Sequence, residues 1–122
     1  MYAIDFRRDV NLLDIRWQGL FDLAAVDRYA GELVRRFREE GFAPGYRLRM
    51  DMSRCSVQPV AAAAAINRRL TDFPLASRIA IVTSSAITRL QVRRLMTQSH
   101  LRIFDTADTA FEWLTADQAA AA

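Results

Sequence analysis

Residues 46–85, YRLRMDMSRCSVQPVAAAAAINRRLTDFPLASRIAIVTSS, decide the fold. Over the first seven of these residues apolar side chains alternate with charged ones, which is the period-2 pattern of a strand with one buried face. The alanine-rich segment after Pro59 carries apolar residues at helical spacing until Pro74, so it predicts a helix. The run IAIV at 79–82 is apolar throughout, which is typical of a central strand. The stretch therefore predicts a strand, a helix and a second strand parallel to the first.

The residues before this stretch predict a hairpin and a helix. Residues 2–7 and 13–18 both alternate in polarity and are joined by a short turn segment, so they predict two antiparallel strands. Asp22 is a good N-cap for an amphipathic helix that ends near Gly41.

The residues after this stretch predict two further helices and a last strand. Thr83, Ser84 and Ser85 have the side chains of a helix cap, so a third helix is expected from there to about Gln98. Residues 101–104 predict the last strand, and a short helix follows it.

The element order β-β-α-β-α-β-α-β-α predicts an α/β fold with a mixed five-stranded sheet. We expect residues 1–116 to form one domain and the alanine-rich residues 117–122 to fray. A sheet with helices on both faces needs apolar residues on both sides of its strands, but most of these strands keep a polar side. We therefore expect the helices mainly on one face and an open reverse face, on which charged side chains pair across strands: Asp5, Arg7, Asp14, Arg16, Arg47, Arg49, Asp51 and Arg102.

The composition is that of a globular domain, with 52% hydrophobic and 25% charged residues in 122. No apolar stretch approaches the roughly 20 residues that a membrane span requires, and the first residues do not resemble a signal peptide. A single cysteine, Cys55, excludes an internal disulfide and suits a reducing compartment. We therefore expect a cytoplasmic protein without a membrane span.

The sequence lacks the motifs that are typical of several functional classes. Lysine is absent, and no phosphate-loop, dinucleotide, serine-elbow or zinc-protease motif occurs. His100 and Cys55 do not make a metal-ligand set, so we expect no metal, no cofactor and no enzymatic activity. A basic stripe on the second and third helices would attract phosphate backbones, but the chain carries no RNA-binding or helix-turn-helix signature and its net charge is only +3. We do not expect nucleic-acid binding.

The candidate contact residues follow the third and fourth strands, where α/β sheets commonly bind ligands. A free helix N-terminus there attracts anions, and a nearby arginine would add to this attraction. The alternative interpretation is an ordinary helix cap beside a solvated arginine. The candidates for contact with a partner or an anion are Ser53, Arg54 and Ser56 after the third strand, and Thr83, Ser84, Ser85 and Arg89 after the fourth.

The segment Asp51-Met52-Ser53 with its alanine-rich helix resembles the centre of STAS domains, named for sulfate transporters and anti-sigma-factor antagonists. Residues 79–83 and 89–94, and the closing segment 104–114, are similar to a bacterial group that combines STAS with a lipid-transfer (SEC14-like) label. The resemblance implies the fold and a regulatory or interaction role. It also implies a phosphorylated serine or threonine at the start of the second helix, but this chain has PVAA at 59–62.

Two functions remain open. The first is a non-enzymatic STAS-like regulatory module without the phosphoacceptor, which binds another protein or a second copy of itself. The second is a carrier or sensor of a lipid or other small apolar molecule. It predicts a cavity of a few hundred Å³ between the helices and the sheet, lined by residues such as Phe37, Ile66, Leu90 and Phe111.

Overall fold

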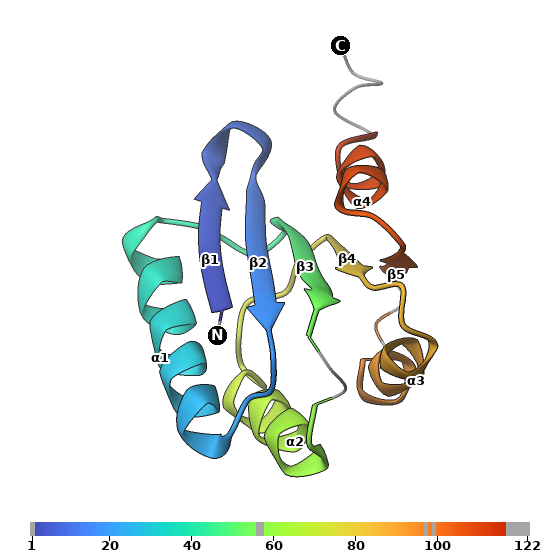
Figure 1. Ribbon diagram of the computed structural model, residues 1–122. Coiled ribbons are helices and arrows are strands. Elements are labelled where there is room, and N and C mark those ends of the chain that lie inside the picture. The colour runs from blue at the N-terminus through green and yellow to red at the C-terminus, as the bar shows by residue number, and fades with distance from the viewer. Residues whose placement is uncertain (1, 56–57, 97, 99, 117–122) are drawn as a thin grey trace.

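The computed structural model describes residues 2–55, 58–96, 98 and 100–116 (Figure 1). Its centre is one sheet whose strands lie in chain order, with β1 antiparallel to β2 and the other neighbours parallel. The strands are β1 (Tyr2–Arg7), β2 (Leu12–Gln18), β3 (Arg47–Arg54), β4 (Arg78–Val82) and β5 (Leu101–Phe104). The predicted mixed five-stranded sheet is confirmed. The predicted frayed tail at 117–122 lies outside the described residues.

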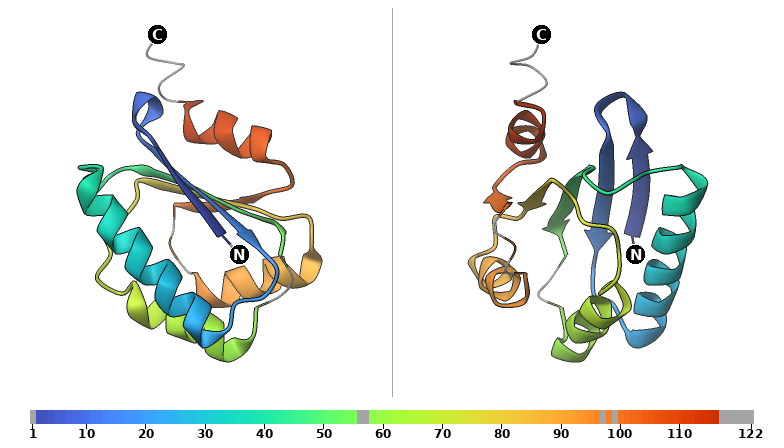
Figure 2. Two further views of the ribbon diagram at one scale, coloured as in Figure 1. Left: turned by 60° about the vertical axis from the view of Figure 1, so that its left-hand side comes forward. Right: turned by 180° about the vertical axis from the view of Figure 1, so that it is seen from behind.

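Three helices cover one face of the sheet and the fourth lies on the other (Figure 2). The first three are α1 (Leu23–Glu39), α2 (Val60–Arg69) and α3 (Ala86–Leu95), and the fourth is α4 (Ala107–Leu114). A short 3₁₀ turn, η1 (Arg8–Val10), and Asn11 with a φ of 53° connect β1 to β2. No helix within the described ranges has the length and apolar character needed to cross a membrane.

The helices begin where the sequence predicts caps. The Asp22 carboxylate accepts a hydrogen bond from the Ala25 N–H at 2.7 Å, which satisfies one of the free donors of α1. The Ser85 hydroxyl does the same for Thr88 at 3.2 Å at the start of α3. The predicted bounds therefore agree with the observed ones within a few residues.

The main core lies between the sheet and helices α1 to α3. Alternate residues of a strand point to the same face, so β2 contributes Leu13, Ile15 and Trp17 to this core while Asp14 and Arg16 face the other way. A second, smaller cluster lies on the reverse face under α4 and contains Leu12, Ala80, Val82, Ala110 and Leu114.

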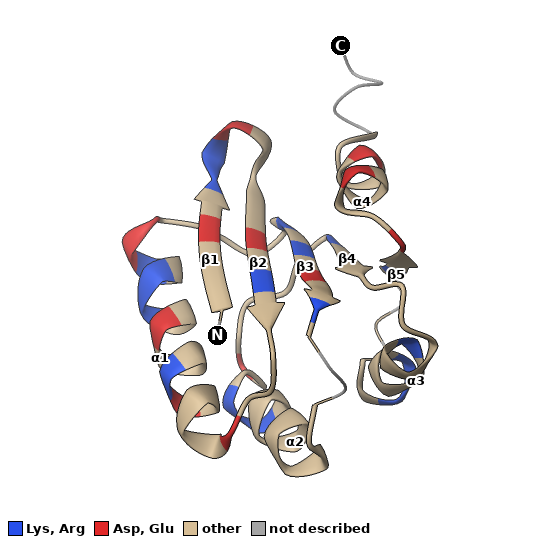
Figure 3. Cartoon of the chain, in the orientation of Figure 1, with Lys and Arg blue, Asp and Glu red and all other residues tan. Residues whose placement is uncertain are grey.

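The expectation of an open reverse face is wrong for the part that α4 covers. The all-apolar run of β4 places Ala80 and Val82 on this side, and both are buried against the helix. Charged residues lie along β1 to β3 (Figure 3), and one predicted cross-strand pair forms beneath α4. There the Arg49 guanidinium donates to the Asp14 carboxylate at 2.6 and 3.0 Å and lies over the ring of Phe111. This part of the face is therefore packed, with its charges paired.

Candidate functional site

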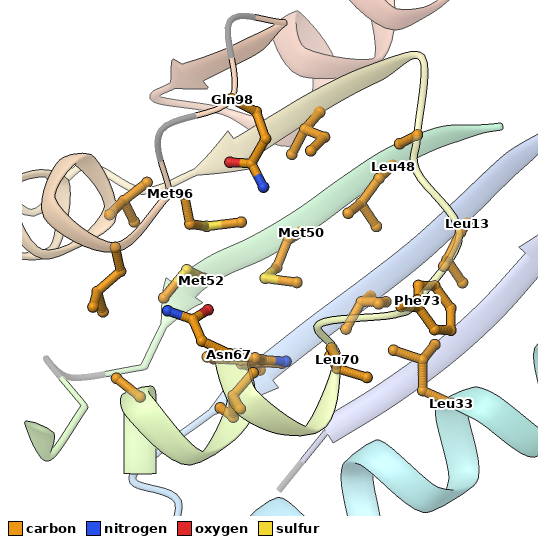
Figure 4. A pocket seen from close by; sticks show the side chains of 18 of the residues that line it. Leu13, Leu33, Leu48, Met50, Met52, Asn67, Leu70, Phe73, Met96 and Gln98 are labelled. Atoms are coloured by element: carbon orange, nitrogen blue, oxygen red, sulfur yellow. The ribbon is translucent and has the colours of Figure 1, made fainter. Parts of the chain in front are cut away.

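A pocket of about 380 Å³ lies between the sheet and helices α2 and α3 (Figure 4). Its floor is formed by alternate residues of three neighbouring strands: Leu13, Ile15 and Trp17 of β2, Leu48, Met50 and Met52 of β3, and Ile79 of β4. Its walls include Tyr29 and Leu33 of α1, Ala63 and Ile66 of α2, and Val92 and Leu95 of α3. The pocket therefore lies between the middle strands of the sheet and the helices that cover this face.

Small side chains leave this space open. The buried residues of α2 are Ile66 and three alanines, which cannot fill the distance to the sheet. Within α3, all of whose residues the structure describes, only Thr88 and Val92 are buried. Neither helix supplies the long apolar side chains that would complete a solid core here.

The lining is apolar and adaptable on the inside and polar at the rim. Met50, Met52 and Met96 contribute flexible thioethers that can pack against differently shaped molecules. The side chains of Asn67 and Gln98 lie on opposite sides of the pocket (Figure 4), and both residues are exposed. Among the described residues that line the pocket, none carries a charge.

Two glutamines, Gln58 and Gln91, form a clamp that joins two connections to helix α3 and also line the pocket. The Gln58 N–H donates to the Gln91 side-chain oxygen at 3.1 Å, and the Gln91 amide donates back to the Gln58 carbonyl at 2.7 Å. The Gln58 side chain accepts from the Phe21 N–H at 2.9 Å and donates to the Gly19 carbonyl at 3.0 Å. This glutamine clamp ties the β2–α1 connection and the start of α2 to α3.

Two buried polar groups beside the pocket, one on α1 and one on β2, lack a hydrogen-bond partner among the described residues. Neither the Tyr29 hydroxyl nor the Trp17 indole N–H makes a hydrogen bond within the described structure, although both groups are buried. Burial raises the pKa of Tyr29 well above its ordinary value. The indole lies near enough to lower that pKa slightly, but the two groups do not meet hydrogen-bond geometry. Hydrogen-bonding capacity therefore remains unused beside the pocket.

The predicted contacts after β3 are only partly described. The Ser53 hydroxyl donates to the Asp51 carboxylate at 2.6 Å, so it closes a local turn. The Arg54 side chain is exposed, and its backbone carbonyl accepts from the Gly19 N–H at 3.3 Å. Ser56 lies outside the described residues.

The predicted contacts after β4 lie together at the start of α3. Thr83 is buried, and its hydroxyl oxygen accepts from the Ser85 N–H at 3.2 Å. Ser84 is exposed, and Ser85 caps the helix. The Arg89 guanidinium pairs with the Asp105 carboxylate and donates to the Thr83 carbonyl at 3.4 Å.

The two groups of candidates lie on adjacent connections, because β3 and β4 are parallel neighbours. None of the six described candidates lines the pocket: Ser53, Arg54, Thr83, Ser84, Ser85 and Arg89.

The predicted cavity is present, but its lining is mostly different from the one expected. Of the four predicted residues only Ile66 lines it. Phe37 packs edge-on against Phe73 and other rings of the core, and Leu90 lies on the exposed side of α3. Phe111 belongs to α4 on the reverse face. No sequence signal predicts the glutamine clamp, since Gln58 lies in the connection before α2, Gln91 lies within α3, and neither belongs to a motif.

The remaining nucleophilic and metal-binding side chains are dispersed. The Cys55 thiol donates to the Met52 carbonyl at 3.2 Å, and burial raises its pKa, which makes it a weak nucleophile at neutral pH. Among the described residues no group of three or more histidine, cysteine and acidic side chains could hold a metal ion.

Two solved structures share the architecture over nearly the whole chain. An uncharacterised protein of the DUF3478 family from Shewanella loihica, which has a SpoIIAA-like fold, gives a TM-score of 0.69 at 17% identity over 93% of each chain. An anti-sigma factor antagonist from Mycobacterium paratuberculosis gives 0.66 at 10% identity, over 93% of this chain and 92% of the other. The chain has a SpoIIAA-like, or STAS, fold.

The STAS fold confirms the resemblance inferred from residues 51–53 and the following helix. No family model matches the sequence, and no curated protein matches it. Because one fold supports many functions, a STAS fold alone does not decide what this pocket or these connections do.

Proposed function

We propose that the protein is a non-enzymatic carrier or sensor of a small, mainly apolar molecule that binds in the pocket between the sheet and helices α2 and α3. The observation that carries this proposal is the pocket itself. Its volume of about 380 Å³ lies within the range of about 300–1,000 Å³ that is usual for small-molecule sites. It also resembles such sites in having apolar walls and a few polar groups at its rim.

The hydrophobic effect supplies the affinity. Each 100 Å² of apolar ligand surface removed from water contributes about 2.5 kcal/mol, before the cost of losing free motion is subtracted. The methionines Met50 and Met52 let the floor adapt to the ligand, and the alanines of α2 leave room for it. A molecule in this pocket completes a core that the chain itself leaves unfilled.

The proposal is non-enzymatic because the described lining residues include no pair of groups suited to acid–base or nucleophilic chemistry. Tyr29 holds its proton strongly, and Cys55 is a weak nucleophile outside the pocket. Such a site releases the molecule that it binds unchanged. With its single cysteine, the protein is proposed to act in the reducing environment of the cytoplasm.

Native mass spectrometry with a pocket-filling variant tests the proposal. Protein purified without detergent is expected to carry a small molecule that is released on denaturation. Ala63→Leu fills part of the pocket and should lose this mass, whereas Ala61→Leu, on the exposed side of α2, should keep it. Circular dichroism confirms that both variants fold. Unliganded wild-type protein that also fails to bind any added apolar molecule would contradict the proposal.

A second function is favoured by apolar residues at the carboxyl end of the parallel strands. Leu20 is exposed on the connection after β2, and Val60 and Ile87 are exposed at the starts of α2 and α3, the helices that follow β3 and β4. Exposed apolar groups with a polar rim suit a protein interface. Under this proposal the chain is a regulatory module that binds a protein partner or forms a homodimer. Val60, 84% exposed, stands at the start of α2, within the stretch 59–62 where the resemblance implies a phosphoacceptor.

Light scattering and affinity copurification test this second function. The wild type should be recovered with a protein partner or as a dimer. Val60→Asp should lose that association, because it places a charge in the apolar contact. Ala43→Asp, at the amino end of the strands, is the matched control and should keep it. A wild-type monomer without a partner would count against an interaction role.

A further inference from the structure

We infer that the pocket selects uncharged ligands: apolar molecules whose polar group is a neutral hydroxyl, ester or amide, and not the matching carboxylates. The inference rests on the proposed carrier or sensor function and names the class of molecule that the site takes. The inference is based on the absence of charged side chains from the described lining and on the neutral polar side chains that are present there.

The described residues that line the pocket include no aspartate, glutamate, arginine or histidine, and the chain contains no lysine. Several arginines are next in sequence to lining residues on α2 and α3, but none of them lines the pocket, and four are exposed: Arg68, Arg69, Arg93 and Arg94. Arg69, two residues after Asn67 on α2, pairs with Asp27 of α1. Arg89, two residues before Gln91 on α3, pairs with Asp105. A ligand carboxylate in this pocket therefore contacts no opposite charge among the described lining residues.

An unpaired charge is expensive to move from water into an apolar site. A carboxylic acid avoids this cost only by binding in its protonated form, which is a very small fraction of the total at pH 8. A neutral alcohol of the same length carries no such cost, because a hydroxyl needs only a hydrogen-bond partner.

Neutral partners are available at the rim. The carboxamides of Asn67 and Gln98 each offer a donor and an acceptor from opposite sides of the pocket (Figure 4). Thr71 adds an exposed hydroxyl near the end of α2, although that hydroxyl also donates to the Asn67 carbonyl at 2.9 Å. These groups can pair with a ligand hydroxyl, ester or amide in either direction. They provide no full charge for a carboxylate.

The test compares 1-octanol with octanoate, which share an eight-carbon chain. Both are titrated into isotopically labelled protein at pH 8, and binding is followed by the amide chemical shifts of residues lining the pocket, such as Ile66 and Val92. The alcohol is expected to bind at least about tenfold more tightly than the carboxylate. The affinity for octanoate should rise by about tenfold when the pH falls from 8 to 7, while the affinity for 1-octanol should not change.

A designed cation gives a second readout. Asn67→Arg places a positive charge at the rim and should raise octanoate affinity by about tenfold, with 1-octanol little changed. Ala61→Arg changes the net charge equally but lies outside the lining, so it should leave both affinities as they are.

The outcomes separate this inference from the function on which it rests. Equal binding of both molecules at pH 8 would overturn the selection of uncharged ligands and leave the proposed ligand site intact. Binding of neither would overturn the proposed site, and the inference with it.

Discussion

Tyr29 and Tyr46 are both buried in the main core, yet only one of the two hydroxyls has a hydrogen-bond partner. The Tyr46 hydroxyl donates to the Pro74 carbonyl at 2.7 Å. The Tyr29 hydroxyl, beside the pocket, donates to no group within the described residues. A buried polar group without a partner destabilises the ligand-free protein. The Tyr29 hydroxyl therefore lowers the stability of the free protein, while a ligand that offers it a hydrogen bond would gain from it.

Replacing each tyrosine by phenylalanine measures this difference. Tyr29→Phe removes an unsatisfied hydroxyl and should leave the free energy of unfolding unchanged or raise it by about 1 kcal/mol in the ligand-free protein. Tyr46→Phe removes a made hydrogen bond and leaves the Pro74 carbonyl unpaired, so it should cost about 1–2 kcal/mol. Urea unfolding measures both. A larger loss for Tyr29→Phe than for Tyr46→Phe would contradict this account.

The same tyrosines predict how stability depends on alkaline pH. Burial raises the pKa of Tyr29 and of Tyr46 above the ordinary value near 10, so above that pH the unfolded chain loses its phenol protons before the folded one does. Their stabilising contribution is complete below about pH 10. It should fall above that pH by up to about 1.4 kcal/mol per pH unit for each tyrosine. Urea unfolding from pH 9 to 11 should show this slope, to which Tyr2 and Cys55 add because their pKa values are raised by burial as well, and Tyr29→Phe should make the slope smaller.

Most element bounds could be predicted because their signals are local. Asp22 and Ser85 cap the helices that the sequence assigns to them, and alternation of polarity identifies the strands. The side on which α4 packs could not be predicted in this way. It depends on Leu12, Ala80 and Leu114 meeting across three elements, while the charges of Asp14 and Arg49 suggest an open face.

The pocket could be predicted only as a class of site. The pocket forms where small residues of α2 lie opposite methionines of β3. Which residues face each other there depends on how the whole helix packs against the sheet. The glutamine clamp was not predictable either, because Gln58 and Gln91 are far apart in the sequence and carry no motif. The clamp nevertheless has a structural function, because it holds α3 to the connections that precede α1 and α2.

Gln58→Leu tests that function of the clamp. The substitution keeps the volume but leaves the Phe21 N–H and the Gly19 carbonyl without their partners in a buried site. The free energy of unfolding should fall by about 1–3 kcal/mol. Gln98→Leu, at the exposed rim, is the matched control and should change it by less than about 0.5 kcal/mol. Equal effects of the two variants in urea unfolding would show that the clamp contributes nothing.

At the scale of the whole molecule, the two faces of the sheet differ in where their charged residues lie. On the helical face the described lining of the pocket carries no charge, whereas the reverse face uses arginines as packing groups. Guanidinium groups lie over the two aromatic rings of α4: Arg7 and Arg49 over Phe111, and Arg78 and Arg102 over Trp113. Planar guanidinium groups suit such stacking better than lysine, which this chain lacks. This division leaves the uncharged pocket as the proposed ligand site.

A crystal structure of the protein grown with 1-octanol tests the central claim most directly. The account predicts electron density for the ligand between β3 and helices α2 and α3, in contact with Met50, Met52 and Ile66 and with its hydroxyl near Asn67 or Gln98. A pocket filled instead by the protein's own methionine side chains, with α3 packed down on the sheet and no ligand bound, would contradict it.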